Sequence, residues 1–414
     1  MSDLASSPAP APVLHGAKHN VFILSMAQAV NGSSGPITIA IGALSGAYLV
    51  PDHLVLATLP VAIRSIGLAL FALPVATLCK HLGRKLGFAS GAFLGIIGAL
   101  ISCYALVHMQ FKLFCFGYFL LGGASAFVQQ YRFAAADQGN DKFKSRAISW
   151  VMTGGILAAF IGPQAALRTK DLLLPTPFAG AFLAMAALLV LGILILFLLK
   201  PIPDTKSGAA HETPTTRPLS QIMKQPVFFV ALLCAVSTFA LMTFVMTGAP
   251  LAMTHHGHSQ EHAILGIQWH VMAMFAPSFI TGSLIVRFGK IPVIAAGLLL
   301  LILCALVALS GLALWNFWVS LILLGIGWNF GFIGSTALLG ESYTSDEKNI
   351  IQGTHDTILF GIVAIAALSS GVILDSFGWQ AIVFAPLPVA SFSLIALVWL
   401  SLNIRKERAL TETT

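Results

Sequence analysis

The stretch Cys79-Lys80-His81-Leu82-Gly83-Arg84-Lys85 separates two long apolar segments, and a shorter counterpart, Phe288-Gly289-Lys290, separates two others. Gly289 follows Gly83 by 206 positions. A second pair of similar stretches is separated by almost the same distance in sequence, 203 positions. In it, Leu121-Gly122 before Ala126-Phe127 is matched by Leu324-Gly325 before Asn329-Phe330. Similar residues recurring after half a chain predict two diverged copies of one structural unit.

The composition requires lipid around most of the chain. Of the 414 residues, 57% are hydrophobic and only 9% are charged, whereas about 25% are charged in ordinary soluble domains. Apolar runs of about 20 residues end repeatedly at Pro, Gly or charged residues, as expected of helices that cross a bilayer. A porin-like barrel is excluded, since its strands would alternate polar and apolar residues.

The apolar runs predict an all-α membrane protein with twelve transmembrane helices in two pseudo-symmetric six-helix bundles. The expected spans are 20-46, 54-78, 87-108, 112-133, 146-167, 176-200, 226-253, 263-287, 291-311, 315-338, 351-374 and 379-403.

The polar segments divide the chain into five parts. Residues 1-19, rich in Ala, Pro and Ser, lack the apolar core and cleavage site of a signal peptide and are expected to form a cytoplasmic tail. A six-helix bundle at 20-200 is followed by a polar linker at 201-225. The second bundle spans 226-403, and a short cytoplasmic tail occupies 404-414.

The basic residues predict the orientation. With both termini in the cytoplasm, 18 of the 22 lysines and arginines lie on the cytoplasmic side, while Lys112, Arg168 and Lys170 lie outside. This asymmetry follows the positive-inside rule for a multi-pass protein of the bacterial inner membrane. The net charge of +7 is therefore a sign of topology, and no nucleic-acid partner is expected.

The basic loops after the second and eighth helices, Cys79 to Lys85 and Gly282 to Lys290, resemble those of the major facilitator superfamily. The acid that this family carries in the loop is missing from both copies, where Lys80 and Val286 stand near its place. The resemblance implies a central cavity that opens alternately to the two sides of the membrane, and it leaves the substrate unspecified.

Methionine and histidine pairs recur in the seventh and eighth helices. Met242 and Met246 lie one turn apart, as do His270 and Met274. Counted from the periplasmic ends, Met246 and His270 are both ~10 Å deep, and Met242 and Met274 both ~16 Å deep. Two matched layers of thioether and imidazole near the membrane centre favour copper, especially Cu(I). Packing of methionines is the alternative.

The same pairs, with Gly257-His258-Ser259 between them, resemble the MxxxM and HxxxM motifs of the CcoA-like copper importers. That resemblance implies that Met242, Met246, His270 and Met274 carry copper for the assembly of cytochrome oxidase, with a downstream copper chaperone as a partner. The resemblance also implies a role for cysteine thiols, which are important in the CcoA-like importers. Cys234 lies eight residues before Met242 and is a candidate relay, or else a small core residue.

A histidine cluster precedes the eighth helix. His255, His256, His258 and His262 crowd a predicted periplasmic loop. Neutral imidazoles there have the chemistry to capture a metal ion before it enters. A solvated polar turn explains the cluster equally well. The five cysteines form no closely spaced pair, so neither a disulfide framework nor a zinc site is indicated.

Charged residues inside the helices are candidates for gating or coupling. Arg64 lies in the second helix, and the second helix of the resembled family faces the eleventh, which carries His355 and Asp356. An Arg64 to Asp356 ion pair or a His355 to Asp356 proton relay is therefore expected. Arg132 and Asp137 are expected to pair at the inner end of the fourth helix.

The stretch Asn31-Gly32-Ser33-Ser34-Gly35-Pro36 interrupts the first helix in mid-membrane. A break there either exposes backbone groups to the cavity or serves as a packing kink.

These features lead to a secondary copper importer working by alternating access, with copper as cargo and no resident cofactor. One alternative is a carrier of a small organic solute or drug, for which the methionines form an adaptable apolar wall. Another is a copper sensor or assembly factor that transports nothing. Phosphate loops, HExxH and nucleophile elbows are absent from the sequence, so no enzymatic activity is expected.

Overall fold

A computed structural model describes residues 16–138, 141–201, 217–344 and 347–412. The predicted linker and the predicted N-terminal tail lie largely outside these residues, whereas residues 404–412 of the predicted C-terminal tail continue the last helix. The predicted domain boundaries stay predictions. The described residues form helices joined by short connections, and no strand occurs among them. This confirms the predicted all-α membrane fold.

The first half of the chain contains one short 3-10 turn and seven helices. In order these are α1 (Ala17–Asn31), α2 (Ser34–Leu49), η1 (Leu54–Leu56), α3 (Leu59–Val107), α4 (Phe111–Gln129), α5 (Tyr131–Ala136), α6 (Asp141–Thr169) and α7 (Ala179–Leu196).

The described residues of the second half form eight helices. They are α8 (Leu219–Met223), α9 (Pro226–His255), α10 (Gln260–Phe275), α11 (Ser278–Phe288), α12 (Lys290–Leu309), α13 (Leu314–Leu339), α14 (Lys348–Phe384) and α15 (Pro386–Glu412).

The helices agree with twelve membrane crossings. By length and hydropathy alone, nine spans qualify among the described residues, or ten when the bent pair α10 and α11 counts as one. One qualifying span, Ile350–Lys406, is 57 residues long and contains two crossings, because the helix is broken at Gly378. The first crossing is split into α1 and α2, each too short to qualify alone.

The split in the first crossing lies at Gly32 and Ser33, within the stretch that the sequence marked as interrupted. Both residues keep right-handed helical dihedrals. The amides of Ser33 and Gly35 bond three residues back, to Val30 and Gly32, at 3.2 Å each. The break is therefore a tightened 3-10 turn, and these two amides do not open to a cavity.

The repeated glycines adopt the same unusual backbone conformation. Gly83 has φ 74° and ψ 158°, and Gly289 has φ 90° and ψ 166°. Gly378, between the last two crossings, has φ 77° and ψ −177°. This region of dihedral space is accessible essentially to glycine alone. Each glycine therefore reverses the chain between two crossings, and Gly83 and Gly289 support the internal repeat.

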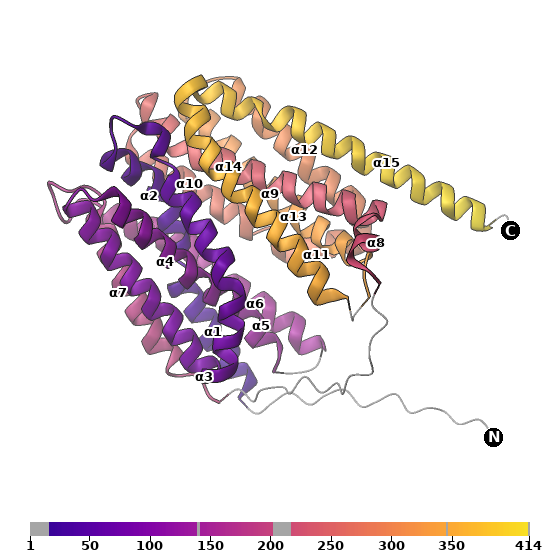
Figure 1. Ribbon diagram of the computed structural model, residues 1–414, viewed down its shortest axis with the longest axis horizontal. Coiled ribbons are helices and arrows are strands. Elements are labelled where there is room, and N and C mark those ends of the chain that lie inside the picture. Colours follow the sequence, from indigo (N-terminus) through magenta and orange to yellow (C-terminus); the bar gives the residue numbers. More distant parts are fainter. Residues whose placement is uncertain (1–15, 139–140, 202–216, 345–346, 413–414) are drawn as a thin grey trace.

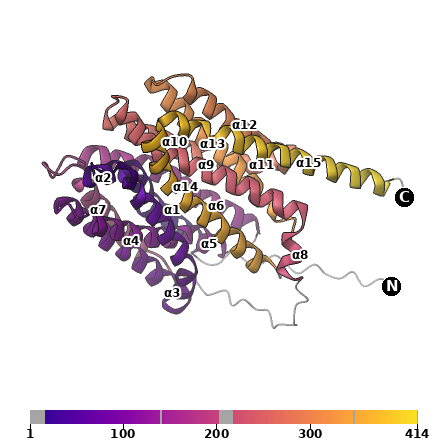
Figure 2. The same ribbon diagram turned by 45° about the horizontal axis from the view of Figure 1, so that its top comes forward.

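The two halves of the chain form two groups of helices that converge at one end (Figure 1). The groups meet near α2 and α10 and diverge toward the turn in the middle of α3 and the C-terminal end of α15, and the turned view agrees (Figure 2). Across the junction α3 packs against α14, α6 against α10, and α2 against both α9 and α10. Substrate access between the halves is therefore expected from the end where α1 begins.

Three polar contacts join the halves within the described residues, all near the converging end. The Thr58 hydroxyl reaches the Leu368 carbonyl at 3.5 Å. The Gln164 amide donates to Gln268 at 2.8 Å. The Lys170 ammonium lies 2.9 Å from the Glu261 carboxylate, and together these contacts close that end.

Glycines show how close the helices come at each end. At Gly371 in α14, an added Cβ would lie 2.4 Å from the Thr58 hydroxyl and 2.9 Å from the Val55 carbonyl. Small residues permit such close helix approach. Toward the diverging end of the same helix, an added Cβ at Gly353 or Gly361 would meet nothing within 4 Å. The helix pair is thus tight at one end and open at the other.

Arg217, which lies within the predicted linker, holds the end of the second half that faces the divergence. Its guanidinium forms two hydrogen bonds with the Glu347 carboxylate, at 2.8 and 2.7 Å, and one with the Ser342 carbonyl at 3.1 Å. The Arg217 hydrogen bonds hold the pKa of Glu347 below its usual range. The carboxylate therefore stays ionised, and the contact stays formed, through the physiological pH range.

Candidate functional site

Five aromatic side chains from four helices of the second half form one cluster near the junction. Phe239 of α9 lies edge-on to Trp328 and Phe332 of α13, with ring centroids 5.4 and 5.2 Å apart. Phe275 of α10 lies 6.5 Å from Trp328, and Phe360 of α14 lies 5.9 Å from Phe239. We call these five residues the aromatic cluster.

Trp328 is the polar member of the aromatic cluster. Its ring stacks on Phe332 at 5.3 Å with an interplanar angle of 15°. Its indole Nε1 is buried and has no hydrogen-bond partner. A buried indole N–H normally finds an acceptor. The cluster therefore combines aromatic faces with one unused hydrogen-bond donor.

Arg64 occupies the facing half, six residues into α3. Its Nη2 donates to the Ser125 hydroxyl of α4 at 3.0 Å, and its buried Nε has no partner. Gly35 of α2 is its other close neighbour, since an added Cβ there would lie 3.4 Å from Nη2. The structure thus assembles Arg64, Ser125 and Gly35 from three helices of one half.

The expected ion pair between Arg64 and Asp356 is absent from this structure. Asp356 instead bonds His355, whose Nδ1 lies 2.9 Å from the Asp356 carboxylate. The two residues do not pair because they lie at different distances from the point where α3 and α14 meet, which is the contact between Thr58 and Leu368. Arg64 lies ~9 Å along its helix from that contact, and Asp356 ~18 Å along its own.

The expected pair of Arg132 and Asp137 is also wrong. Asp137 pairs with Arg84 at 2.5 Å, and the Arg132 guanidinium lies over the Phe133 ring at 4.8 Å. Arg132 is seven residues beyond Ser125, or ~10 Å farther toward the open end, which brings it to about the level of Asp356.

His355 and Asp356 are neighbours in sequence and in space, as expected. His355 is buried, and its Nε2 has no hydrogen-bond partner. Asp356 is exposed, with 59% of its side chain accessible. The carboxylate is therefore free to meet a partner from the other half.

The four predicted metal ligands are all buried in the second half. Met242 and Met246 lie in α9, and His270 and Met274 in the neighbouring α10. The His270 Nδ1 lies 2.7 Å from the Leu321 carbonyl of α13. Because this contact assigns the proton to Nδ1, Nε2 is the acceptor, and it is buried without a partner. A free Nε2 suits either a metal ion or a hydrogen-bond donor.

Cys234 is fully buried against α15, and its Sγ lies 3.9 Å from the Ser393 carbonyl. All five cysteines are free. Two of the predicted capture histidines bind backbone carbonyls, His256 that of Ala252 at 2.7 Å and His258 that of Leu312 at 2.8 Å. Within the described residues, His, Cys, Asp and Glu form no group of three or more able to hold a metal.

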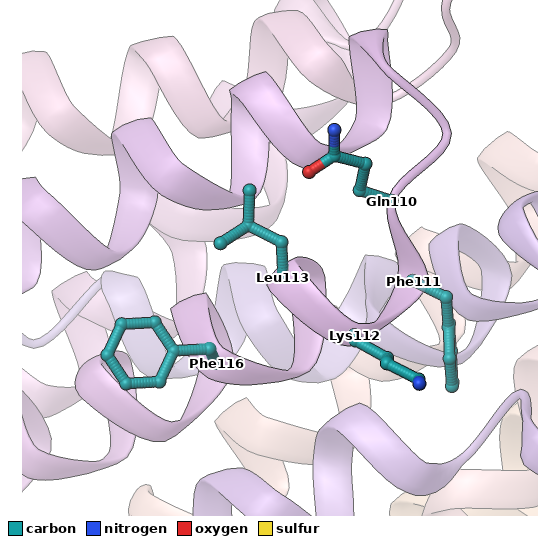
Figure 3. Close-up of a pocket in the computed structure, with 5 residues that line it drawn as sticks. All are labelled: Gln110, Phe111, Lys112, Leu113 and Phe116. Atoms are coloured by element: carbon teal, nitrogen blue, oxygen red, sulfur yellow. The ribbon is translucent and has the colours of Figure 1, made fainter.

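A hollow at the start of α4 is a poor candidate for a transport site (Figure 3). It is lined by Gln110, Phe111, Lys112, Leu113 and Phe116. All five belong to one stretch at the surface of the first half. A site that serves both sides of a membrane must lie between the two halves, so this hollow is set aside.

The aromatic cluster is the feature that sequence reasoning missed. Trp328 and Phe332 lie one helical turn apart in α13, a spacing visible in the sequence. The chain has 29 phenylalanines. The sequence alone does not distinguish the rings of the aromatic cluster from those that face lipid or pack in the core. Phe239 lies about 90 residues before Trp328 in the sequence, so only the three-dimensional structure shows that the two rings are in contact.

Comparison with known proteins identifies relatives along nearly the whole chain. The sequence profile of the Major Facilitator Superfamily matches residues 21–363. The chain is 45% identical over 383 residues to the riboflavin transporter RfnT of Brucella anthropi, covering 92% of this chain and 96% of that protein. It is 30% identical over 379 residues to the uncharacterized MFS-type transporter YdeG of Bacillus subtilis, covering 88% of each.

Solved structures with the same fold are also found. A point mutant of the nucleoside transporter NupG superposes with a TM-score of 0.67 over 92% of this chain and 99% of its own, at 15% identity. The unmutated NupG gives 0.63 over 93% and 98%, at 14% identity. Likeness at this level of identity establishes the fold alone.

Proposed function

This chain belongs to the major facilitator superfamily of membrane transporters, and from this premise we propose that it carries riboflavin or a closely related flavin. It is a multi-pass secondary transporter and has no enzymatic role. The observation behind the choice of substrate is the 45% identity to a riboflavin transporter along 92% of the chain. This favours the organic-solute alternative over copper.

The aromatic cluster supports a flavin on chemical grounds. The isoalloxazine of a flavin is a planar three-ring system with carbonyl and ring-nitrogen acceptors. Trp328 and Phe332 offer stacked aromatic faces, and the free Trp328 Nε1 offers a donor. Pockets for small molecules usually combine apolar and aromatic walls with a few well-placed polar groups, and this cluster has that composition.

We propose alternating access between the state described above and one closed at the opposite end. In this state the contacts Thr58 to Leu368, Gln164 to Gln268 and Lys170 to Glu261 close one end. Closure of the other end would bring Arg132 and Asp356 into an ion pair, since they face each other from opposite halves at about the same depth. Asp356 would then exchange His355 for Arg132 as its partner.

The membrane orientation is part of the proposal. The excess of basic residues on one side supports a cytoplasmic position in a bacterium for both termini and the open end, with the closed end outside. The loop from His255 to His262 would then lie outside as well.

Copper transport is the second candidate, and one observation favours it. The His270 Nε2 is a buried acceptor without a partner, on the helix next to Met242 and Met246. A supply of copper to cytochrome oxidase, a downstream copper chaperone and a relay through Cys234 all depend on this candidate and are proposed only with it.

Uptake by intact cells tests the proposal. A bacterial strain without its own riboflavin uptake would be compared with and without this chain, using radiolabelled riboflavin and, in parallel, copper. Saturable riboflavin uptake that depends on the chain is expected, with copper accumulation unchanged. Copper uptake without riboflavin uptake would reverse the order of the two candidates.

A further inference from the structure

We propose that Arg64 is the residue that recognises the hydrogen-bond acceptors of the transported flavin, binding two acceptor atoms of its pyrimidine ring through the guanidinium fork. This inference rests on the proposed function, and it deepens that proposal by naming the polar contact that complements the aromatic cluster.

The hydrogen bonding of Arg64 is incomplete in the structure. Its Nη2 donates to the Ser125 hydroxyl at 3.0 Å, while its Nε is buried and has no acceptor. Within the described part of the chain, no carboxylate lies within ion-pair distance of this guanidinium. The cation is therefore held in place by a neutral hydroxyl and retains unused donors.

An unpaired cation at this depth requires an explanation. A charged side chain inside the bilayer is costly, and such residues usually face a cavity or a partner. The acid expected to pair with it, Asp356, lies ~9 Å farther along the helix axis, at the level of Arg132. A structural ion pair therefore does not account for Arg64, whereas a ligand that supplies acceptors does.

The position of Arg64 gives a ligand access to it. The residue lies ~9 Å below the Thr58 contact that closes one end, which places it at the inner end of the open side. It is partly exposed, and its helix packs against α14 of the opposite half. The neighbour at Nη2 is Gly35, which has no side chain to cover the guanidinium.

The hydrogen-bond donors of the Arg64 guanidinium complement the acceptors of the isoalloxazine ring system. A guanidinium presents N–H groups in a rigid plane and binds paired acceptors with defined geometry, while a lysine ammonium is a point charge. The pyrimidine half of isoalloxazine carries a carbonyl oxygen next to a ring nitrogen on each of two edges. Arg64 would hold one such edge, and the aromatic cluster of the other half would stack the ring.

Riboflavin binding by purified full-length protein in detergent tests the role of Arg64. The protein quenches flavin fluorescence if the ring stacks on Trp328, so a titration yields the affinity. We expect Arg64→Lys and Arg64→Gln each to weaken binding at least tenfold, while Arg287→Lys, a matched change at an exposed arginine of α11, leaves it unchanged. The unfolding temperature of each variant shows whether it is folded.

A second measurement uses the unaltered chain. Phenylglyoxal modifies accessible arginines, and mass spectrometry of the resulting peptides reports each site. Riboflavin should protect Arg64 and leave Arg287 reactive. Parental affinity in Arg64→Lys, or no protection of Arg64, would overturn this inference alone. A parent protein that binds no flavin would overturn the proposed function and the inference together.

Discussion

Buried polar atoms without partners are the residue-scale signal of function in this chain. Native proteins satisfy nearly all such groups, yet Trp328 Nε1, Arg64 Nε and His270 Nε2 are all buried and unpaired. Arg64 and His270 lie on α3 and α10, which pack across the junction of the halves, and Trp328 lies on α13, which packs against α9 and α10. The donors at Trp328 and Arg64 are the ones that the proposed flavin site uses, whereas the His270 acceptor belongs to the second candidate, copper.

The Trp328 donor is tested by Trp328→Phe, which keeps an aromatic ring and deletes the N–H. Loss of one hydrogen bond costs about 1 kcal/mol, so riboflavin affinity should fall roughly fivefold with normal protein abundance. Trp315→Phe is the matched control, because Trp315 is 70% exposed on the same helix. Equal affinities for both variants, measured by flavin titration, would remove Trp328 from the site.

The methionine and histidine motifs separate the two candidate substrates. Met→Leu nearly preserves volume, so such swaps usually cost less than about 1.5 kcal/mol. For a flavin carrier, Met242→Leu, Met246→Leu, Met274→Leu and His270→Gln should each retain riboflavin uptake within about twofold of the parent. Uptake is normalised to protein in the membrane. Loss of copper accumulation in all four, with no riboflavin uptake in the parent, would favour a copper site.

Sequence reasoning predicted more about elements than about side-chain partners. The crossings, the break between Asn31 and Pro36, and the glycine turns follow from hydropathy and from glycine placement, which act locally along the chain. The partners of Arg64, Arg132 and Asp137 were mispredicted, because pairing depends on the register between helices. That register is set by packing, as at the Thr58 to Leu368 contact.

The glycine turns between crossings have a measurable energetic role. A side chain at Gly83 or Gly289 would occupy a conformation that costs about 1–3 kcal/mol, although an added Cβ at Gly83 meets nothing within 4 Å. Gly83→Ala and Gly289→Ala should lower the unfolding temperature or the amount of protein in the membrane.

Gly353→Ala is the control for these turn variants. An added Cβ at Gly353 also meets open space, but this glycine lies within helix α14, where alanine is favoured over glycine by about 1 kcal/mol. It should therefore be neutral or stabilising. If Gly83→Ala were as stable as Gly353→Ala, the backbone argument would be wrong.

The proposed closure of the open end is tested by exchanging two charges. Arg132→Asp and Asp356→Arg should each impair riboflavin transport, because each places like charges opposite one another. The double exchange restores attraction and should recover transport, with a coupling energy of about 1 kcal/mol or more. Additive losses in transport rate would show that the two residues do not meet.

At the scale of the whole molecule, the proposed site draws different parts from the two halves. The second half supplies the aromatic cluster, and the first half supplies Arg64 beside Gly35 and Ser125. Neither half alone surrounds a ligand. A solute that binds both halves can couple its own passage to their relative movement, as the repeat-built architecture of transporters requires.

Counterflow by the purified protein tests the central claim most directly. The chain is reconstituted into liposomes preloaded with unlabelled riboflavin, and entry of external radiolabelled riboflavin is followed against liposomes without protein. A carrier of flavins should produce a transient accumulation of label that unlabelled riboflavin outside abolishes. Label entering no faster than into protein-free liposomes, from protein shown to be folded, would contradict the assignment of riboflavin as substrate.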